Sequence, residues 1–264
     1  MKIWFQLLSS ETGMRGFLDA TQKLVDRAMP PGVTVEVRGT THGVIGDQYR
    51  LFCNYDTREV IDNALRIRQE GGYDAFVIAN SMDPVLVELR EMLDIPVVAF
   101  METCAFTACT FGERFGVIGV NRKLMAWYRS IVYGYGIADR LAAMEPMEVA
   151  DTRSLDLGFT DSAFGDMLQE QLVAAGRRAI DKGAEVLFVG GPPGTLMAQR
   201  GVFTIDGVPL LDTYTLLAKT AETMAVMHKL TGTCVSRHLL YAAPAPELVR
   251  KVGAAYGVPP LRNG

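Results

Sequence analysis

The 264 residues of this chain suffice for one large domain or for two lobes, either with a substantial hydrophobic core. Hydrophobic residues make up 49% and charged residues 21%, and no apolar stretch approaches the roughly 20 residues that a membrane helix needs. The net charge of −4, without a Lys/Arg-rich block, excludes a surface that holds a nucleic-acid backbone, so we expect a small molecule as partner.

The start of the chain and its cysteines bear on location and metal binding. Residues 3–8 form a short apolar run that stops at Ser9 without the small-residue cleavage site of a signal peptide. We therefore predict a buried strand here and a cytoplasmic protein. The 4 cysteines form no CxxC pair and have no histidine at zinc-ligand spacing, so we expect no metal site.

Short apolar runs alternate with amphipathic stretches of helical length, which is the pattern of parallel strands joined by crossover helices. We predict strands at 2–8, 33–38, 75–79, 96–100, 115–120, 186–190 and around 208–211. Predicted helices lie near 13–27, 57–70, 84–93, 122–133, 164–182 and 213–230. Gly, Pro or Asn marks most of the breaks, as turn chemistry requires.

The two halves of the chain follow the same plan. Helix 57–70 leads through a Gly-Gly turn into an apolar run that ends at Asn80, and helix 164–182 leads through Gly183 into a run that ends at Gly191. We therefore predict an α/β protein of two pseudo-symmetric lobes, each a parallel sheet flanked by helices. Because ligands bind at the carboxyl ends of parallel strands, both post-strand turns should border one ligand cleft between the lobes.

The lobes also receive provisional boundaries. We place the first lobe at 1–100, the second at 101–212 and a C-terminal extension at 233–264. The last long helix, about 213–232, is expected to pack back on the first lobe. Because the lobes expose helical faces, we also expect a homo-oligomer.

Three segments resemble a known family. Residues 77–86 read Val-Ile-Ala-Asn-Ser-Met-Asp-Pro-Val-Leu, residues 184–191 read Ala-Glu-Val-Leu-Phe-Val-Gly-Gly, and residues 207–212 read Gly-Val-Pro-Leu-Leu-Asp. In this order and spacing they resemble the cofactor-independent aspartate/glutamate/hydantoin racemases, a superfamily that includes arylmalonate decarboxylases and maleate isomerases. The resemblance runs from about residue 2 to 230 and implies the two-lobed fold, a small-molecule substrate and no cofactor.

The resemblance also implies where catalytic thiols would stand. The family's racemases use one cysteine on each face of the substrate: a thiolate removes the α-proton and a thiol returns a proton from the other side. Asn80 and Gly191 stand at the two corresponding positions. Because a carboxamide has no usable pKa and glycine has no side chain, we predict that two-cysteine racemisation does not operate in this chain.

Candidate catalytic residues follow the predicted strands. Asn80 either caps the next helix or orients a substrate carbonyl, and Ser81 either serves the same pocket or satisfies the turn. His42, on the loop after the second strand, is a candidate general base, with an ordinary surface histidine as the alternative. Cys104, after the fourth strand, is a candidate thiol that matches neither family position.

Other residues at strand ends are expected to contact the substrate. Gly190, Gly191 and Pro192 form either a plain tight turn or a turn whose backbone N–H groups approach a ligand. The remaining expected contacts, which the resemblance implies, are Gln6, Ser9, Ser10 and Thr103.

The sequence thus predicts a cofactor-independent enzyme that acts on a small carboxylate, cyclic amide or imide by acid/base chemistry without thiols. By resemblance the enzyme is an isomerase or a lyase. Two alternatives stay open: a hydrolase that opens a ring amide on the same scaffold, and a non-catalytic protein that binds a small ligand.

Overall fold

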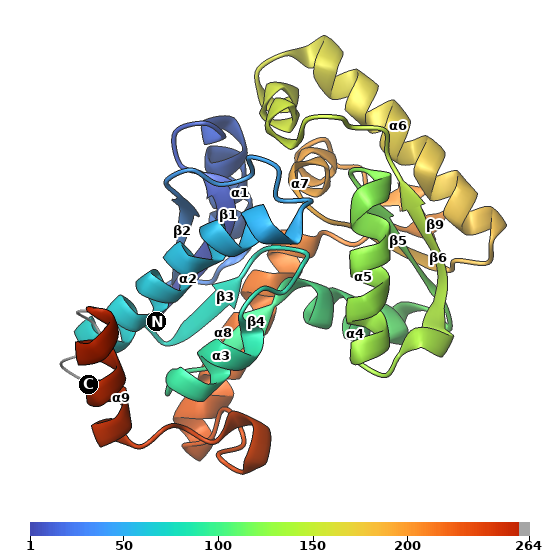
Figure 1. Cartoon of the computed structure of the whole chain (residues 1–264). Helices are drawn as coiled ribbons and strands as arrows, with labels where there is room; N and C mark the ends of the chain where they lie inside the picture. Colours follow the sequence, from blue (N-terminus) through green and yellow to red (C-terminus); the bar gives the residue numbers. More distant parts are fainter. Residues whose placement is uncertain (259–264) are drawn as a thin grey trace.

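A computed structural model describes residues 1–258, which form two parallel sheets flanked by helices (Figure 1). The first sheet has the strand order β2-β1-β3-β4, with β1 at Lys2–Ser10, β2 at Thr34–Thr40, β3 at Ala75–Ile78 and β4 at Val97–Ala99. The second has the order β6-β5-β7, with β5 at Phe115–Gly119, β6 at Leu141–Pro146 and β7 at Val186–Val189. All pairs in both sheets are parallel, which confirms the predicted α/β architecture of two lobes.

Helices cover both faces of the first sheet. α1 (Arg15–Ala28) and α8 (Thr213–Thr231) pack together on one face, and α2 (Arg50–Glu70) and α3 (Leu86–Met92) lie on the other (Figure 1). Side-chain alternation along β1 matches this layering. The ring of Phe5 packs against Tyr214 of α8, whereas the side chain of Gln6 bonds to Asn63 of α2.

The second sheet is covered in the same way. α4 (Phe100–Phe111) and α5 (Arg122–Gly134) contact each other and β5, while α6 (Ser162–Asp181) packs on β5 and β6 and contacts α7 (Pro192–Gln199). A two-stranded antiparallel pair, β8 (Thr204–Ile205) and β9 (Val208–Pro209), precedes α8. Three short 3₁₀ helices, η1 (Ala138–Arg140), η2 (Thr152–Phe159) and η3 (Leu239–Tyr241), and α9 (Pro246–Tyr256) complete the described chain. Residues 259–264 of the predicted extension lie outside the described residues.

Side-chain caps fix where three of the long helices begin. The carboxamide of Asn121 accepts from the backbone N–H of the third residue of α5, and the carboxylate of Asp161 accepts from two N–H groups at the start of α6. Asp212 caps α8 by accepting from Thr215. Each cap satisfies backbone donors that have no partner inside the first helical turn, and so sets the entry of its helix.

Several elements differ from the sequence prediction for physical reasons. α2 begins at Arg50, whereas the sequence pattern predicts a start at 57. The pattern misses the first turns because they expose large side chains such as Leu51 and Tyr55, so their apolar residues do not mark one buried face. β4 ends at Ala99, and α4 follows directly where the prediction continues the strand. The segment around 208–211 forms the two-residue β9, paired antiparallel with β8, and then a single parallel bridge from Leu210 to Leu187 of β7. Among residues 1–258, no helix is long and apolar enough to cross a membrane.

Candidate active site

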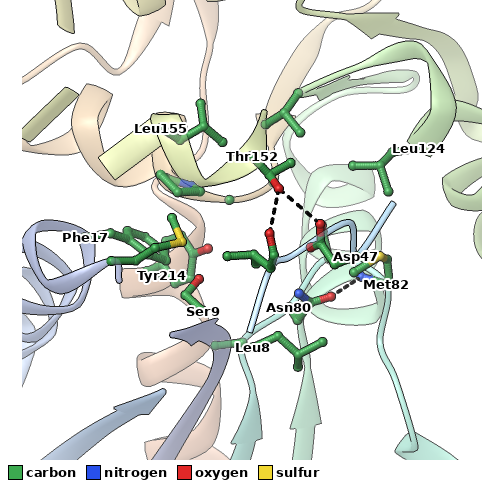
Figure 2. Close-up of a pocket in the computed structure, with 18 of the residues that line it drawn as sticks. Leu8, Ser9, Phe17, Asp47, Asn80, Met82, Leu124, Thr152, Leu155 and Tyr214 are labelled. Carbon is green, nitrogen blue, oxygen red and sulfur yellow. Dashed lines mark hydrogen bonds between the residues drawn. The ribbon is translucent and has the colours of Figure 1, made fainter. Parts of the chain in front are cut away.

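The carboxyl ends of both parallel sheets meet at one small cavity (Figure 2). Its walls come from the last residues of β1 and the turn after it, and from the residues that follow β3, β5 and β7. The helices α1, α5, α7 and α8, the β2–α2 loop and η2 complete the walls. Its volume is about 40 Å³, which is room for about three water molecules. A small cavity is therefore present between the two sheets, where the sequence predicts the ligand cleft.

Most of the cavity wall is apolar, and its ionisable groups are few. Within the described part of the chain, no cysteine, histidine, lysine or arginine lines the cavity. Its ionisable side chains are Asp47, Tyr128 and Tyr214. No cluster of three or more His, Cys, Asp or Glu side chains that could hold a metal ion occurs among residues 1–258. The cavity thus offers one carboxylate and no cation to a ligand.

The turn after β3 presents two polar side chains to the cavity. The Oδ1 atom of Asn80 accepts from the backbone N–H of Met82 at 3.0 Å, so the amide nitrogen lies on the other side of the group (Figure 2). The Ser81 hydroxyl is buried and lies 2.5 Å from the hydroxyl of Tyr128 on α5. Burial raises the pKa of Tyr128 above its usual range, so these hydroxyls form a neutral pair.

The turn after β7 lies opposite the β3 turn. A Cβ atom added to Gly190 would stand 2.7 Å from the Cβ and Oγ of Ser81, so the two strand ends are in direct contact. Gly191 has a φ of +79°, which L-residues rarely adopt, yet an added Cβ would meet nothing nearer than 3.9 Å. Pro192 then begins α7. This side of the cavity therefore presents backbone and open space, without a reactive side chain.

Asp47, on the loop between β2 and α2, supplies the cavity's carboxylate. The residue is only 6% exposed, and its Oδ1 accepts from the hydroxyl of Thr152 at 3.3 Å (Figure 2). Burial raises the pKa of Asp47 to about 6; nearby Asp56 adds to the rise, while the hydrogen bond from Thr152 opposes it. A carboxyl with this pKa can exchange protons near neutral pH.

The structure brings six of the predicted residues to the cavity. They are Ser9, Asn80, Ser81, Gly190, Gly191 and Pro192. Asp47 is not among the residues that the sequence predicts, because no motif surrounds it. The one sequence feature that could have indicated Asp47 is its position on the loop after the second strand, the same loop that carries His42.

Four predicted residues lie away from the cavity. His42 is exposed, and its backbone carbonyl accepts from Arg153 at 2.7 Å. Cys104 and Thr103 are buried in α4, and burial raises the pKa of the Cys104 thiol well above its usual value. Ser10 bonds within the loops, accepting from Gly13 at 3.1 Å.

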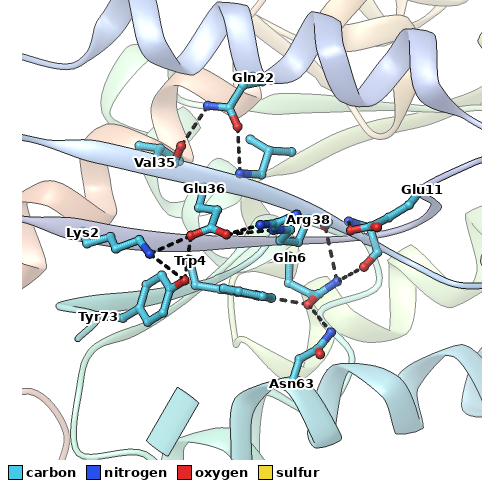
Figure 3. Close-up of polar contacts among 12 residues, drawn as sticks. Lys2, Trp4, Gln6, Glu11, Gln22, Val35, Glu36, Arg38, Asn63 and Tyr73 are labelled. Carbon is cyan, nitrogen blue, oxygen red and sulfur yellow. Dashed lines mark hydrogen bonds and ion pairs between the residues drawn. The ribbon is translucent and has the colours of Figure 1, made fainter. Parts of the chain in front are cut away.

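Gln6 also lies outside the cavity, on the α2 side of the first sheet (Figure 3). Its Oε1 accepts from the indole N–H of Trp4 and from Asn63, both at 3.0 Å, and its Nε2 donates to backbone carbonyls. The side chain is fully buried and its hydrogen-bonding groups are occupied. Its contacts are those of a structural network between strand and helix.

Comparison with known proteins agrees with this architecture. A sequence model described as Asp/Glu/Hydantoin racemase matches residues 8–221. The chain therefore belongs to the Asp/Glu/hydantoin racemase family.

Individual relatives show how far the similarity extends. The chain is 30% identical over 167 residues to a hydantoin racemase of Pseudomonas sp. (strain NS671), a match that spans 62% of this chain and 63% of that protein. It is 23% identical over 171 residues to a hydantoin racemase of Paenarthrobacter aurescens, covering 65% of this chain and 70% of that protein. The first match thus spans less than two thirds of the relative's length.

Among solved structures, the fold is similar to that of an allantoin racemase from Klebsiella pneumoniae. The TM-score is 0.78 with 20% identity, and the match covers 93% of this chain and 94% of that one. At this identity the similarity is one of fold.

Proposed function

We propose that this chain is a cofactor-independent isomerase that moves a proton at a carbon atom of a small, uncharged cyclic amide or imide, with the carboxylate of Asp47 as the base. The observation that carries the proposal is the buried carboxyl of Asp47, with a pKa raised to about 6, in a cavity where two parallel sheets meet. A base with this pKa is ionised at neutral pH, and can still return the proton it removes. The related hydantoin racemases support the choice of substrate class.

The charge of the cavity favours a ring amide over an amino acid. A substrate carboxylate needs a cation or several N–H donors, and the described cavity wall contains no lysine or arginine. Such a carboxylate would also be repelled by the ionised Asp47 in a site of low dielectric constant. A neutral ring with amide N–H and C=O groups avoids both costs. The apolar walls would bury its remaining surface.

The turn after β3 supplies the donors that this reaction needs. Removal of a proton next to a carbonyl places negative charge on the carbonyl oxygen, and fixed donors aimed at that oxygen stabilise the transition state. Asn80 has its oxygen engaged by Met82, so its amide N–H groups remain for a ligand. The Ser81–Tyr128 hydroxyl pair holds a second donor nearby.

In this proposal, Asn80 and Gly191 take the places of the family's two thiols, so Asp47 replaces the thiolate. Two features support that correspondence. Both residues line the cavity, and they come from the equivalent strand ends β3 and β7 of the two lobes. The four cysteines of the chain lie elsewhere: Cys53 and Cys104 are buried, and Cys109 and Cys234 are partly buried outside the cavity.

Deuterium exchange tests the proposal. The protein is incubated in D₂O with enantiopure 5-methylhydantoin, whose small ring and side chain suit a cavity of this size, with aspartate and with phenylmalonate, and loss of the α-proton is followed by ¹H NMR. We expect exchange with the hydantoin alone, its abolition by Asp47→Asn, and no effect of iodoacetamide. Asp62→Asn, an exposed carboxylate on α2, is the matched control. Exchange that survives Asp47→Asn, or that iodoacetamide abolishes, contradicts the proposal.

The cavity without thiols also favours one other candidate, a non-catalytic protein that binds the same class of ligand. A thermal-shift screen separates the two, because a ligand that raises the Tm without any exchange or conversion indicates binding alone. The same reaction mixtures test ring opening. A product heavier by one water in mass spectrometry would identify a hydrolase, with Asp47 activating the water.

A further inference from the structure

Thr152, the first residue of η2 (Thr152–Phe159), contacts the β2–α2 loop directly at the wall of the cavity. Its side chain is buried, and its Oγ1 lies 3.1 Å from the carbonyl oxygen of Val44 and 3.3 Å from Oδ1 of Asp47 (Figure 2). A hydroxyl carries one hydrogen, so this donor is shared between two acceptors. The residue that fixes the loop backbone therefore also bonds to the proposed base.

The loop that Thr152 holds is strained. Val44 has a φ of 60°, which is a rare and strained conformation for a β-branched residue. Its N–H donates to Asp56 at 3.2 Å, and its carbonyl is the acceptor of Thr152. The next residue of η2, Arg153, donates to the carbonyl of His42 at 2.7 Å. Two consecutive residues of the second lobe thus hold the strained loop in the position that directs Asp47 into the cavity.

We propose that Thr152 is a positioning residue for the base: its hydroxyl orients the Asp47 carboxylate toward the cavity and favours the ionised form. This inference rests on the proposed function, in which Asp47 removes the proton. Without the hydroxyl, the carboxylate would lose its one side-chain donor among the described residues. An apolar replacement at 152 therefore leaves a base that is harder to ionise.

The backbone N–H groups of Asp47 and Gln48 also favour the ionised form of Asp47, but the other ionisable side chains near it do not. Asp56 on α2 is a like charge and raises the pKa of Asp47. Cys53 on α2 and Tyr128 on α5 also lie within electrostatic range, but burial raises the pKa of both, so they stay neutral near pH 7. Thr152 is the side chain among these neighbours that lowers the pKa of Asp47.

The test is a direct titration of Asp47. In protein labelled with ¹³C at the aspartate carboxyls, the Asp47 signal is assigned by its loss in Asp47→Asn and followed from pH 4 to 9. We expect a midpoint near 6 in the wild type and a rise of about one pH unit in Thr152→Val, the equivalent of one hydrogen bond to a charged group. Thr152→Ser should keep the wild-type midpoint.

The sign of the shift separates positioning from a purely structural role. If Thr152 only anchored the loop, its loss would admit water and lower the pKa of Asp47 toward its ordinary value. An unchanged or lowered midpoint in Thr152→Val therefore overturns the inference, as does a Thr152→Ser midpoint that follows Thr152→Val. If Thr152→Val does not fold, Thr152→Ala removes the same hydroxyl. Ser154→Ala is the matched control, because Ser154 lies in the same 3₁₀ helix and its hydroxyl donates to the backbone carbonyl of Asp151, just before that helix.

The titration needs no turnover, so it is independent of the deuterium-exchange experiment. Exchange that is unaffected by Asp47→Asn contradicts the proposed function alone, whereas an unshifted midpoint in Thr152→Val contradicts the role of Thr152 alone. If Asp47 is the base and Thr152 positions it, the pH at which the exchange rate rises should be higher in Thr152→Val, by the same amount as the titration midpoint.

Discussion

Replacing Asp47 with asparagine is predicted to stabilise the protein at neutral pH. The pKa of Asp47 rises from 3.8 to about 6 on folding because the carboxyl is buried. The folded state thus binds this proton more tightly than the unfolded chain, so the contribution of the carboxyl is complete below about pH 4 and is lost as the pH rises through about 6. A shift of about two units corresponds to about 3 kcal/mol at pH 7. Asparagine keeps the acceptor for Thr152 and does not ionise.

Urea unfolding of the wild type and of Asp47→Asn at pH 4.5 and pH 7.5 measures this effect. The variant should be more stable by about 1 kcal/mol at the lower pH, where the unfolded carboxyl is already mostly ionised, and by about 3 kcal/mol at the higher pH. Asp62→Asn should show no such difference, because that side chain is exposed. A variant that is less stable than the wild type at both pH values would refute the reasoning. If Asp47 is retained for function at a cost in stability, Asp47→Asn should be more stable than the wild type and inactive.

Three further substitutions test the cavity and the edge of the first sheet. Tyr128→Phe removes the partner of the Ser81 hydroxyl and should lower kcat/KM for exchange by about 10²-fold. The control Tyr133→Phe, on the exposed side of α5, should leave kcat/KM unchanged. Gly190→Ala places a Cβ 2.7 Å from Ser81 and should cost about 1–3 kcal/mol in urea unfolding and most of the activity. Gln22 of α1 donates to the carbonyl of Val35 at 2.8 Å and accepts from the N–H of Val37 at 2.9 Å, on the outer edge of β2 (Figure 3). Gln22→Ala should therefore lower the free energy of unfolding by about 1–3 kcal/mol. Because it leaves two backbone groups of an edge strand unpaired, it should also increase self-association in light scattering.

The fold follows from the sequence because apolar runs bounded by glycine and proline recur between amphipathic segments. That pattern places Asn80 and Gly191 at the ends of equivalent strands, and both line the cavity in the structure. It does not show which face of a strand a polar residue occupies. Gln6 is one such case, since its side chain points to α2 and away from the cavity.

The proposed base, Asp47, is harder to predict because its place at the cavity depends on contacts between distant segments. His42 and Asp47 share a loop, and the backbone decides which of them turns inward, through positive φ angles at Val44 and Gly46. The contact that fixes Asp47 joins it to Thr152, 105 residues further along the chain. Cys104 is misleading for a related reason: α4 begins directly after β4, so this thiol lies on the buried face of a helix.

A cavity with one base also predicts an isotopic signature of the reaction. Two-base racemases take the proton on one face and return another from the opposite face, so recovered substrate stays unlabelled while product carries solvent hydrogen. Here Asp47 is the single carboxylate of the described cavity wall, Tyr128 is held neutral, and Gly191 offers no acid on its side. With a single base, inversion requires the planar enolate to turn its other face toward Asp47 before the proton returns. We therefore expect Asp47 to return solvent deuterium mostly to the same face, so that exchange with retention in D₂O is faster than inversion.

Gly191→Cys tests that prediction by adding an acid on the opposite side. The open space at Gly191 accommodates a Cβ, although the φ of +79° costs about 1–3 kcal/mol of strain. Chiral chromatography and ¹H NMR of the same D₂O reaction give inversion and exchange separately, and the ratio of inversion to exchange should rise in the variant. Gly201→Cys, which also has positive φ and open space but lies outside the cavity, controls for the added thiol. Unlabelled recovered substrate beside fully labelled product in the wild type would instead require a second acid that faces Asp47 across the cavity.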